Sequence, residues 1–451
     1  MVIKGALDLT PDLNPIAEGA RRRIALRLLP FVFLLYVICY VDRANVAFAN
    51  LRMSADLGFS DRVYGFGVGM FFVGYVLFEV PGVIVLERWS ARKWLARIMI
   101  TWGLATVLTG FVRTAGQFYA VRFAVGVAAA SFFPGVIVYL THWFRKDDRA
   151  KAIASFYCAV PAASVVGSLI ATWLLGVQWR GLTGWRWIFI LEGIPPIILG
   201  VITVFYLTDR PREARWLSGE ERDWIERELE QESLAKKRVR DYTILQVFGD
   251  KQILLLILAY FLAHCGLQAS TYWVPTFIKR LSGLPSSQVA LLAALPGLVG
   301  ILTMLGNGWH SDKTGERRWH TSIPLLIGGA AYLLLLSATH NLLLTIFLLV
   351  VGGGAMFAYY PVFWSMPTLV LTETAAAAGF GFINSIGQCG GFVGPYAVGY
   401  LNQRTGTLLA AFAFIGFSYL LAGTVVSTVR IRFARSLAEE NLAVEKLSAA
   451  C

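Results

Sequence analysis

The sequence predicts an all-α integral membrane protein with twelve transmembrane helices in two six-helix halves. Of its 451 residues, 57% are hydrophobic and only 15% are charged, and the mean hydropathy is +0.61. A soluble domain carries roughly 25% charged residues. About twelve apolar stretches are each long enough to cross the roughly 30 Å hydrocarbon core of a bilayer, and one polar segment follows the sixth stretch. The chain therefore belongs in a lipid bilayer.

The spans follow one another with short connections. We expect them at 26–47, 62–86, 94–113, 117–141, 150–176, 186–207, 251–278, 288–309, 320–338, 342–367, 375–402 and 406–429. This divides the chain into a cytoplasmic N-terminal segment (1–25), a six-helix bundle (26–207), a cytoplasmic linker (208–250), a second six-helix bundle (251–430) and a cytoplasmic tail (431–451). The first 23 residues contain no apolar core, so we expect no cleavable signal peptide.

Lysine and arginine collect in alternate loops and set the orientation. These clusters are Arg21, Arg22, Arg23 and Arg27; Arg88, Arg92, Lys93 and Arg97; Arg145, Lys146, Arg149 and Lys151; Lys313, Arg317 and Arg318; and Arg430, Arg432 and Arg435. Because such clusters stay on the cytoplasmic side, both termini of this multi-pass protein are expected there. The net charge of +12 is spread over these loops, so nucleic acid is not expected as a partner.

The composition offers no sign of an enzyme, a cofactor or a metal site. Five scattered cysteines show neither paired spacing nor a metal motif, so we interpret them as small apolar residues: Cys39, Cys158, Cys265, Cys389 and Cys451. No nucleotide loop and no catalytic serine–histidine pair accompanies the spans.

The linker contains one predicted helix. Ser218 and Glu221 form a capping box, in which each side chain bonds a free backbone amide of the other residue. Trp224, Ile225 and Leu229 lie on one stripe of this helix, which suits packing against the membrane-facing end of the bundle. A passive connector between the halves is the simplest interpretation.

A short pattern recurs at the same place in both halves. After the second span the chain reads Glu87-Arg88-Trp89-Ser90-Ala91-Arg92-Lys93, and after the eighth it reads Gly308 to Arg318, with Asp312-Lys313 and Arg317-Arg318. This arrangement resembles the major facilitator superfamily, whose signature loop is Gly-x-x-x-Asp-Arg/Lys-x-Gly-Arg-Arg. The first copy departs from that form at Glu87 and Ala91. Cytoplasmic helix ends alone also produce basic clusters.

Further strings narrow the resemblance. Those that are similar to the anion:cation symporter family are Tyr40-Val41-Asp42-Arg43-Ala44-Asn45, Phe78-Glu79-Val80-Pro81, Arg122-Phe123, Phe132-Phe133-Pro134-Gly135, Trp185-Arg186-Trp187-Ile188-Phe189, and 381–387 with 390–395. The branch of bacterial tartrate, phthalate, hydroxyphenylacetate and sugar-acid permeases looks most similar. The resemblance implies proton-coupled symport of a small organic acid anion, with the anion, protons and lipid as partners and a monomer as the working form.

Charged residues inside the spans mark the candidate site. Asp42 and Arg43 lie about 21 Å along the first span from Leu28, and Arg122 of the fourth span comes to the same depth. Two arginines and one aspartate leave a positive excess, which suits a carboxylate substrate because a guanidinium group offers two parallel donors. A structural charge network that joins the first and fourth spans is the alternative.

The C-terminal half supplies hydrogen-bonding and aromatic residues instead. Candidate contacts for the substrate body are Gln268, Tyr272, Trp273, Tyr359, Tyr360, Trp364, Asn384 and Gln388. The resemblance implies a substrate contact for Asn384. The substrate-binding set is completed by Tyr40, Arg43 and Arg122. Membrane aromatics also serve as core or as interface belts.

Three further ionisable residues lie within spans. We expect Glu79 to join a gating ion-pair network. Glu192 should bind either the backbone groups whose helical hydrogen bonds are broken by Pro195 and Pro196 or a neighbouring arginine. His264 is either a core residue or a proton carrier.

One departure from the family pattern bears on coupling. The family usually carries a glutamate seven residues after the fourth-span arginine, and this chain has Ala129 there. Asp42 remains as a proton carrier, with His264 as the second candidate. An uncoupled uniporter, an anion exchanger and a transporter-like anion receptor stay open as alternatives. The sequence does not name the acid.

We expect alternating access, with the two halves rocking around a midplane site. In the outward-open state, the basic loops should latch the cytoplasmic side, with Glu79, Glu87, Arg88, Arg92, Asp312, Lys313 and Arg317 as gating residues.

Overall fold

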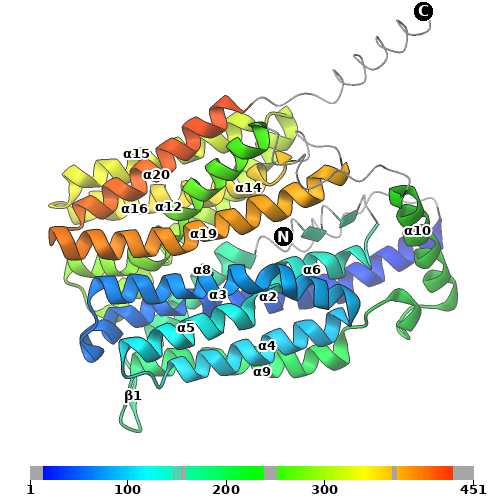
Figure 1. The fold of residues 1–451 in the computed structure, drawn as a ribbon, viewed down its shortest axis with the longest axis horizontal. Coiled ribbons are helices and arrows are strands. Elements are labelled where there is room, and N and C mark those ends of the chain that lie inside the picture. The colour runs from blue at the N-terminus through cyan, green and yellow to red at the C-terminus, as the bar shows by residue number, and fades with distance from the viewer. Residues whose placement is uncertain are drawn as a thin grey trace, which may run out of the picture.

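Two helical bundles pack side by side in the computed structural model, which describes residues 14–145, 148–149, 152–153, 159–237, 251–367 and 373–429. Figure 1 shows the N-terminal bundle in blue and cyan below the C-terminal bundle in green to red. Predicted features that lie outside the described residues include Lys146, Lys151, Cys158, Arg430, Arg432, Arg435, Cys451, 238–250 and the tail 431–451.

The N-terminal half is formed by helices that run back and forth across the bundle. They are α2 (Pro15–Leu57), α3 (Asp61–Arg88), α4 (Ala91–Thr109), α5 (Ala115–Ala129), α6 (Phe132–Thr141), α8 (Ala159–Leu174) and α9 (Gly184–Tyr206). A two-stranded antiparallel hairpin, β1 (Gln178–Trp179) with β2 (Leu182–Thr183), separates α8 from α9. The sequence did not predict this hairpin. Over the residues that the structure describes, the regular secondary structure is helical apart from these four strand residues.

Helix α2 is much longer than the predicted span 26–47. It begins after Asn14, whose side chain accepts a hydrogen bond of 3.0 Å from the Ile16 amide, and it ends at Gly58, which has a positive φ of 67°. A left-handed residue is a common helix stop because glycine adopts it without strain. The prediction was too short because hydropathy marks only the lipid-facing part of a helix.

The fourth span is broken, where the sequence predicted one continuous helix over 117–141. Helix α5 ends at Ala129, and Ser131 has a φ of 65° before α6 begins. Pro134 lies in the first turn of α6, where its missing N–H group needs no helical partner. The chain therefore turns at the midplane directly beside Ala129.

The C-terminal half repeats this organisation. Its helices are α12 (Lys251–Ser282), α13 (Ser286–Leu292), α14 (Leu295–Thr314), α15 (Arg318–Ala338), α16 (Leu342–Ala358), α17 (Tyr360–Phe363), α19 (Glu373–Thr405) and α20 (Leu409–Thr428). The predicted spans 288–309 and 342–367 are each interrupted, at Ala293–Ala294 and at Tyr359, just before Pro296 and Pro361. Each proline starts the following helix, as expected from its lack of an amide hydrogen.

The membrane spans agree with the twelve that were predicted. Within the described residues, nine helical segments have the length and apolar composition to cross a membrane, counting α5 with α6, α13 with α14, and α16 with α17 as one each. Helices α4, α8 and α19 occupy the three remaining predicted spans.

The linker helix α10 (Gly219–Lys237) docks on one end of the N-terminal half (Figure 1). Its predicted capping box is confirmed, since the Ser218 amide donates to Glu221 Oε2 at 2.9 Å and the Glu221 amide donates to Ser218 Oγ at 3.2 Å. Arg145 and Arg149 form salt bridges of 3.0 and 2.9 Å with glutamates of α10. We call this end the linker side, and the opposite end, which carries β1 and β2, the hairpin side.

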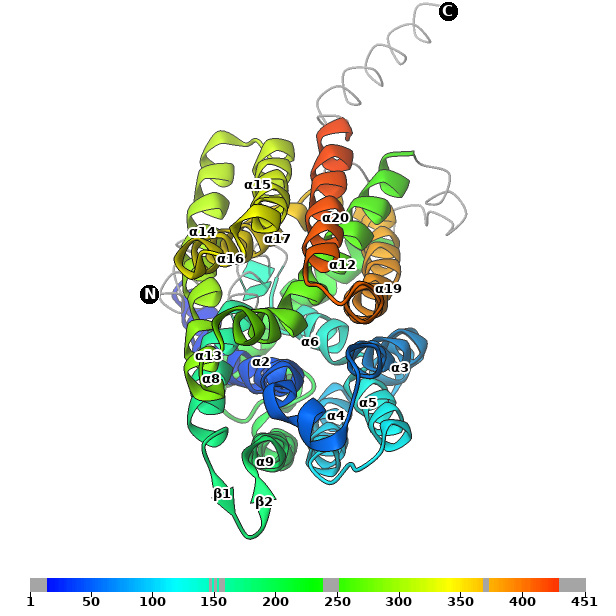
Figure 2. The same cartoon turned by 90° about the vertical axis from the view of Figure 1, so that its left-hand side faces the viewer.

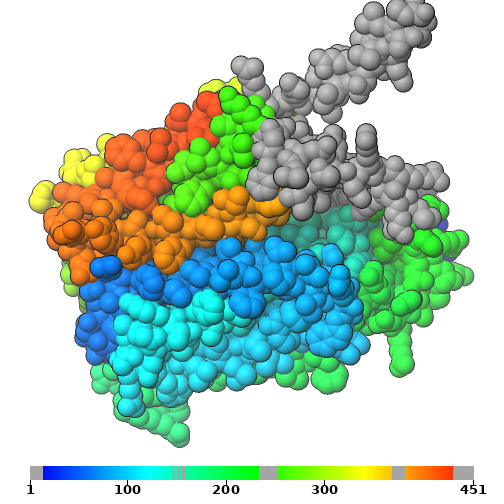
Figure 3. Space-filling model, viewed as in Figure 1, coloured from blue at the N-terminus to red at the C-terminus, as the bar shows by residue number. Residues whose placement is uncertain are grey.

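The largest helix contacts between the two halves (Figure 2) are those of α2 with α12 in the middle, α3 with α19 at one edge, and α8 with α13 and α14 at the other. In the space-filling view, α19 lies directly along α3 (Figure 3). Small residues allow this approach, because a Cβ atom at Gly65 would collide with the carbonyl oxygen of Pro395.

Contacts between the halves close the hairpin side. Asn50 donates to Thr276 at 3.0 Å, the Tyr64 hydroxyl donates to the Tyr272 carbonyl oxygen at 2.9 Å, and Arg280 forms a salt bridge with Asp61. All three contacts join α2 or α3 to the hairpin-side part of α12. This end of the interface is therefore tied shut.

Candidate functional site

A central cavity lies between the two halves, with an empty volume of about 530 Å³ that includes space open to solvent. Its wall combines residues of α2, α3, α4, α5 and α6 with residues of α12, α17 and α19. They are Tyr36, Cys39, Tyr40, Arg43, Phe71, Tyr75, Trp102, Ala129, Phe132, Phe133, His264, Tyr360, Asn384 and Gln388. The predicted candidates Tyr40, Arg43, His264, Asn384 and Gln388 all line it.

Arg43 is held in this wall by aromatic rings. Its guanidinium carbon lies 5.0 Å from the ring centroids of both Phe71 and Phe72, 5.6 Å from that of Tyr40 and 5.9 Å from that of Tyr75. Its Nε and Nη2 atoms are buried without a hydrogen-bond partner. Ring faces attract a cation but leave its N–H donors unused, so Arg43 retains donors for an incoming acceptor.

Arg122 lies at the same level, as the sequence predicted. Its guanidinium carbon is 5.2 Å from the centroid of Phe71, the ring that also contacts Arg43. Arg122 is almost completely buried, and its Nε and Nη2 atoms have no hydrogen-bond partner. Among the described residues neither arginine forms a salt bridge, so two positive charges stand unpaired at one depth.

Asp42 is hydrogen-bonded to neutral donors. Its carboxylate accepts hydrogen bonds from Asn45 at 2.9 Å, one turn along α2, and from Thr106 of α4 at 2.7 Å. The side chain is 2% exposed. The sequence left open a charge network that joins the first and fourth spans. The structure instead binds Asp42 to neutral donors within its own half.

Glu192 of α9 lies in the same part of the N-terminal half. It is buried, and neither carboxylate oxygen has a hydrogen-bond partner. Helix α9 packs there against α4, which carries the Asp42 partner Thr106, and against α2. The expected role, as a partner for groups freed by Pro195 and Pro196 or for an arginine, is not what the structure shows.

His264 and two glutamines form a small network on the opposite wall. His264 Nε2 lies 3.0 Å from Gln268 Nε2 and 3.2 Å from Gln388 Oε1, while its Nδ1 atom is buried without a partner. The ring therefore faces the cavity with one nitrogen engaged by amides.

Glu79 links the halves through neutral partners. Its carboxylate accepts from Asn384 at 2.6 Å and from Ser385 at 3.3 Å, both on α19. The sequence led us to expect an ion pair for Glu79. The difference arises because α3 and α19 pack tightly here and bring amide and hydroxyl donors to the carboxylate.

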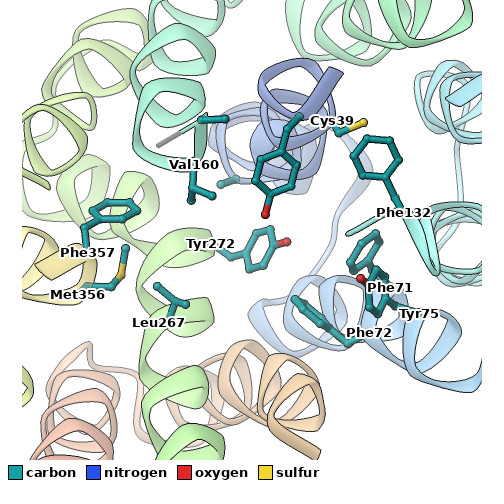
Figure 4. Close-up of a cluster of buried hydrophobic side chains, with 14 of the residues drawn as sticks. Cys39, Phe71, Phe72, Tyr75, Phe132, Val160, Leu267, Tyr272, Met356 and Phe357 are labelled. Atoms are coloured by element: carbon teal, nitrogen blue, oxygen red, sulfur yellow. The ribbon is translucent and has the colours of Figure 1, made fainter. Parts of the chain in front are cut away.

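Three predicted substrate contacts, Tyr272, Trp273 and Trp364, lie outside the lining of the central cavity. Tyr272 is buried among the rings of the site, and its hydroxyl has no hydrogen-bond partner (Figure 4). Trp273 does not line the cavity, since it packs edge-on against Tyr64 with 5.1 Å between ring centroids and donates to the Pro395 carbonyl at 3.1 Å. Trp364 packs against Tyr260 instead of lining the cavity. Neither tryptophan lines the central cavity in this arrangement.

A second, apolar chamber adjoins the central cavity. Its empty volume is about 950 Å³, including open space, and it shares Tyr40 and Tyr360 with the cavity. Most of its other lining residues are apolar, and they include Phe48, Val160, Pro161, Leu267, Val274, Met304, Leu349, Met356 and Phe357. Figure 4 shows Val160, Leu267, Met356 and Phe357 on the side of the site away from Phe132 and Tyr75.

Among the predicted gating residues, Glu79 alone of those described here is bonded to the other half. Arg92 forms a salt bridge of 3.5 Å with Asp209, and Arg317 forms one of 2.6 Å with Asp312. Lys313 lies over the ring of Trp309 at 5.3 Å. These contacts of the basic loops stay on the same side of the interface between the halves. The proposed latch is thus not formed in this arrangement, which is closed on the hairpin side.

Several functional residues were missed by reasoning from the sequence. Phe71, Phe72 and Tyr75 surround Arg43, while Trp102 and Thr106 approach from α4. Trp102 and Thr106 lie four residues apart, so they share one face of α4. This spacing could have indicated that Trp102 and Thr106 act together, but it does not show which helix their shared face contacts.

Comparison with known proteins identifies the class. The model of the Major Facilitator Superfamily matches residues 32–395. The chain is 43% identical over 406 residues to a protein of Agrobacterium vitis named "Putative tartrate transporter", covering 90% of this chain and 92% of that one. It is 35% identical over 409 residues to the "Quinolone resistance transporter" of Acinetobacter baumannii, covering 90% and 94%.

A solved structure shares the fold. The crystal structure of a D-xylose-proton symporter superposes with a TM-score of 0.72 at 16% identity, covering 90% of this chain and 97% of that one. The chain therefore belongs to the Major Facilitator Superfamily of membrane transporters, and its resemblance to the anion:cation symporters is confirmed. It is a multi-pass transporter and not an enzyme.

Proposed function

We propose that this transporter carries a small organic acid anion together with protons across the bacterial inner membrane by alternating access. The observation that carries the proposal is the pair of unneutralised guanidinium groups, Arg43 in the cavity wall and Arg122 against the same Phe71 ring. An unpaired cation in a membrane interior is costly. A carboxylate offsets that cost and accepts the parallel N–H donors of an arginine.

The names of relatives agree with an anionic substrate. The Agrobacterium vitis relative is named for tartrate, a dicarboxylate. In this chain the substrate carboxylate would bind Arg43 at the cavity wall, and the amide groups of Asn384 and Gln388 would bond its polar atoms from the other half. The adjoining apolar chamber suits a carboxylate with an aromatic or alkyl body as well as a compact hydroxy acid.

Asp42 is the proposed proton carrier. It is buried close to Arg43 in sequence, and its hydrogen bonds to Thr106 and Asn45 hold it in position whether or not it carries a proton. Binding of a substrate carboxylate to the arginines would remove positive charge from the surroundings of Asp42 and thus favour its protonated form. Proton and substrate would then cross together.

The cytoplasmic side is assigned to the linker side because the basic loops lie there. Because bonds between the halves tie the hairpin side shut, we assign this arrangement to the cytoplasm-facing state of the cycle. The salt bridges of Arg92 and Arg317 would exchange for contacts between the halves when the transporter reverses.

The test is uptake by proteoliposomes of radiolabelled tartrate, phthalate and hydroxyphenylacetate, with and without an imposed inward proton gradient. We expect at least one acid to accumulate above equilibrium only when the gradient is present. If the uptake of every transported acid is the same with and without the gradient, the protein is a uniporter or an exchanger and not a symporter. Ala129, which stands in place of the family glutamate, favours that alternative. Stoichiometric binding without uptake would indicate a receptor.

A further inference from the structure

Glu192 is a buried acid without a hydrogen-bond donor. Its side chain is 6% exposed, and neither Oε1 nor Oε2 has a partner. A buried carboxylate is costly unless it is bonded, paired or protonated. Since neither of its oxygens is bonded, the environment of Glu192 favours the protonated, neutral acid.

A second carboxyl group lies in the same region of the bundle. A Cβ atom at Gly193, the residue after Glu192 on α9, would meet the backbone of Gly103 and Val107 of α4, and Thr106 of that same stretch of α4 donates to Asp42 at 2.7 Å. Helix α2, which carries Asp42 and its hydrogen-bond donor Asn45, also packs against α9. Two interacting buried carboxyl groups resist ionising together, so their protons belong to the pair.

The surroundings of Asp42 and Glu192 differ, so the two acids differ in which form, charged or protonated, is stabilised. Thr106 of α4 donates to Asp42, and Asn45 donates to it as well, so Asp42 has the donors that stabilise a carboxylate. The charged and titratable groups that act on Asp42 from its surroundings are Arg122 of α5 and Cys39 of α2. Arg122 also favours a charged Asp42. The asymmetry makes Glu192 the member that keeps its proton when Asp42 ionises.

We propose that Asp42 and Glu192 form a two-carboxyl proton site in the N-terminal half, and that Glu192 supplies the second coupling acid that this chain lacks at Ala129. The inference builds on the proposed proton coupling. A proton taken up from the outer solution binds a carboxylate oxygen of the pair and leaves to the cytoplasm from the same pair, with no bond other than O–H formed or broken. The missing glutamate is thus replaced from α9, a different helix from the one that carries Ala129.

The substitution that tests this site is Glu192→Gln, which keeps the shape and removes the exchangeable proton. The matched control is Glu230→Gln on an exposed position of α10. Reconstituted wild type, E192Q and E230Q are compared in two assays: exchange of radiolabelled acid across vesicles loaded with the same acid, and accumulation driven by a proton gradient.

We expect E192Q to exchange substrate within about 2-fold of wild type while gradient-driven accumulation falls, with one proton fewer moved per substrate. E230Q should match wild type in both assays. Unchanged coupling in E192Q would overturn the inference and leave the proposed function intact. A wild type that ignores the gradient would instead overturn the proposed function.

A spectroscopic measurement covers the case in which E192Q does not exchange. The infrared spectrum of E192Q at neutral pH is subtracted from that of the wild type, and the difference should contain the carbonyl-stretch band of one protonated carboxylic acid. The same subtraction with E230Q should contain no such band. A wild-type minus E192Q difference with carboxylate bands and no protonated-acid band would show that Glu192 is ionised, and it would overturn the inference without any transport assay.

Discussion

Arg43 and Arg122 share one aromatic partner: their guanidinium carbons lie 5.0 and 5.2 Å from the ring centroid of Phe71. The ring holds two like charges near each other without neutralising either. Such cation–π contacts are each worth about 0.5–2 kcal/mol, which is less than the cost of burying the charges. The site is thus poised to gain free energy when a carboxylate arrives.

The substitution Arg43→Ala should weaken substrate binding strongly. The loss of a charge-assisted hydrogen bond costs about 1.5–3 kcal/mol, which corresponds to roughly 10–150-fold in affinity. Arg43→Lys should be intermediate, because lysine keeps the charge but lacks the two-pronged donor. Isothermal titration with the transported acid measures the effect. Arg180→Ala, in the hairpin loop beside Trp179, is the control and should bind normally. Equal affinity in R43A and R180A would remove Arg43 from the site.

Gly126→Ala should destabilise the protein, because a Cβ atom there would collide with the backbone carbonyl of Phe71. Overpacking of this kind costs about 1–3 kcal/mol, and it would move the ring that holds both arginines. Thermal melting in detergent checks this. Gly116→Ala on the same helix is the matched control, because no atom lies within 4 Å of its Cβ position. A melting temperature of G126A equal to that of G116A would contradict the close contact of α3 with α5.

The linker side contains a buried salt bridge. Arg21 of α2 binds Asp148 through two contacts, of 2.5 and 2.8 Å, and both side chains are nearly inaccessible. Asp148→Asn removes this countercharge from a buried guanidinium group, and breaking a buried pair costs about 3–5 kcal/mol. Arg23→Ala removes an exposed partner of Glu221 and should cost no more than about 1 kcal/mol. Chemical denaturation of both variants compares the two losses, and similar values would mean that Asp148 is hydrated.

Closure of the hairpin side predicts a crosslink that blocks transport. Asn50 and Thr276 are hydrogen-bonded across the halves at 3.0 Å. In a background without the native cysteines, Asn50→Cys with Thr276→Cys should react with a short bifunctional thiol reagent, and uptake should stop. Each single variant should react without loss of uptake. A fully active crosslinked double variant would show that the halves do not separate there during transport.

The sequence predicted the spans well because lipid imposes a length and a composition on every helix that crosses it. It also predicted the linker helix, since the Ser218–Glu221 capping box is local in the chain. The helix breaks at Ser131 and Tyr359 were missed, because hydropathy continues through them. Prolines just after both breaks were the available signal.

The depth shared by Arg43 and Arg122 was predicted from helix rise alone, and their common contact with Phe71 agrees with it. The partners of Asp42 and Glu192 were not predicted. They depend on how α2, α4 and α9 rotate against one another, and no periodicity in one helix fixes that rotation. Trp273 was misplaced for the same reason, because its face of α12 meets Tyr64 and α19.

The central claim, that substrate and proton move together through Asp42, is tested most directly by recording the internal pH of proteoliposomes with a trapped dye when a transported acid is added outside. The account predicts that the acid acidifies the lumen of wild-type vesicles, and that Asp42→Asn abolishes the acidification while exchange of labelled acid continues. Wild-type uptake of the acid without a change in internal pH, or acidification that survives in D42N, would contradict it.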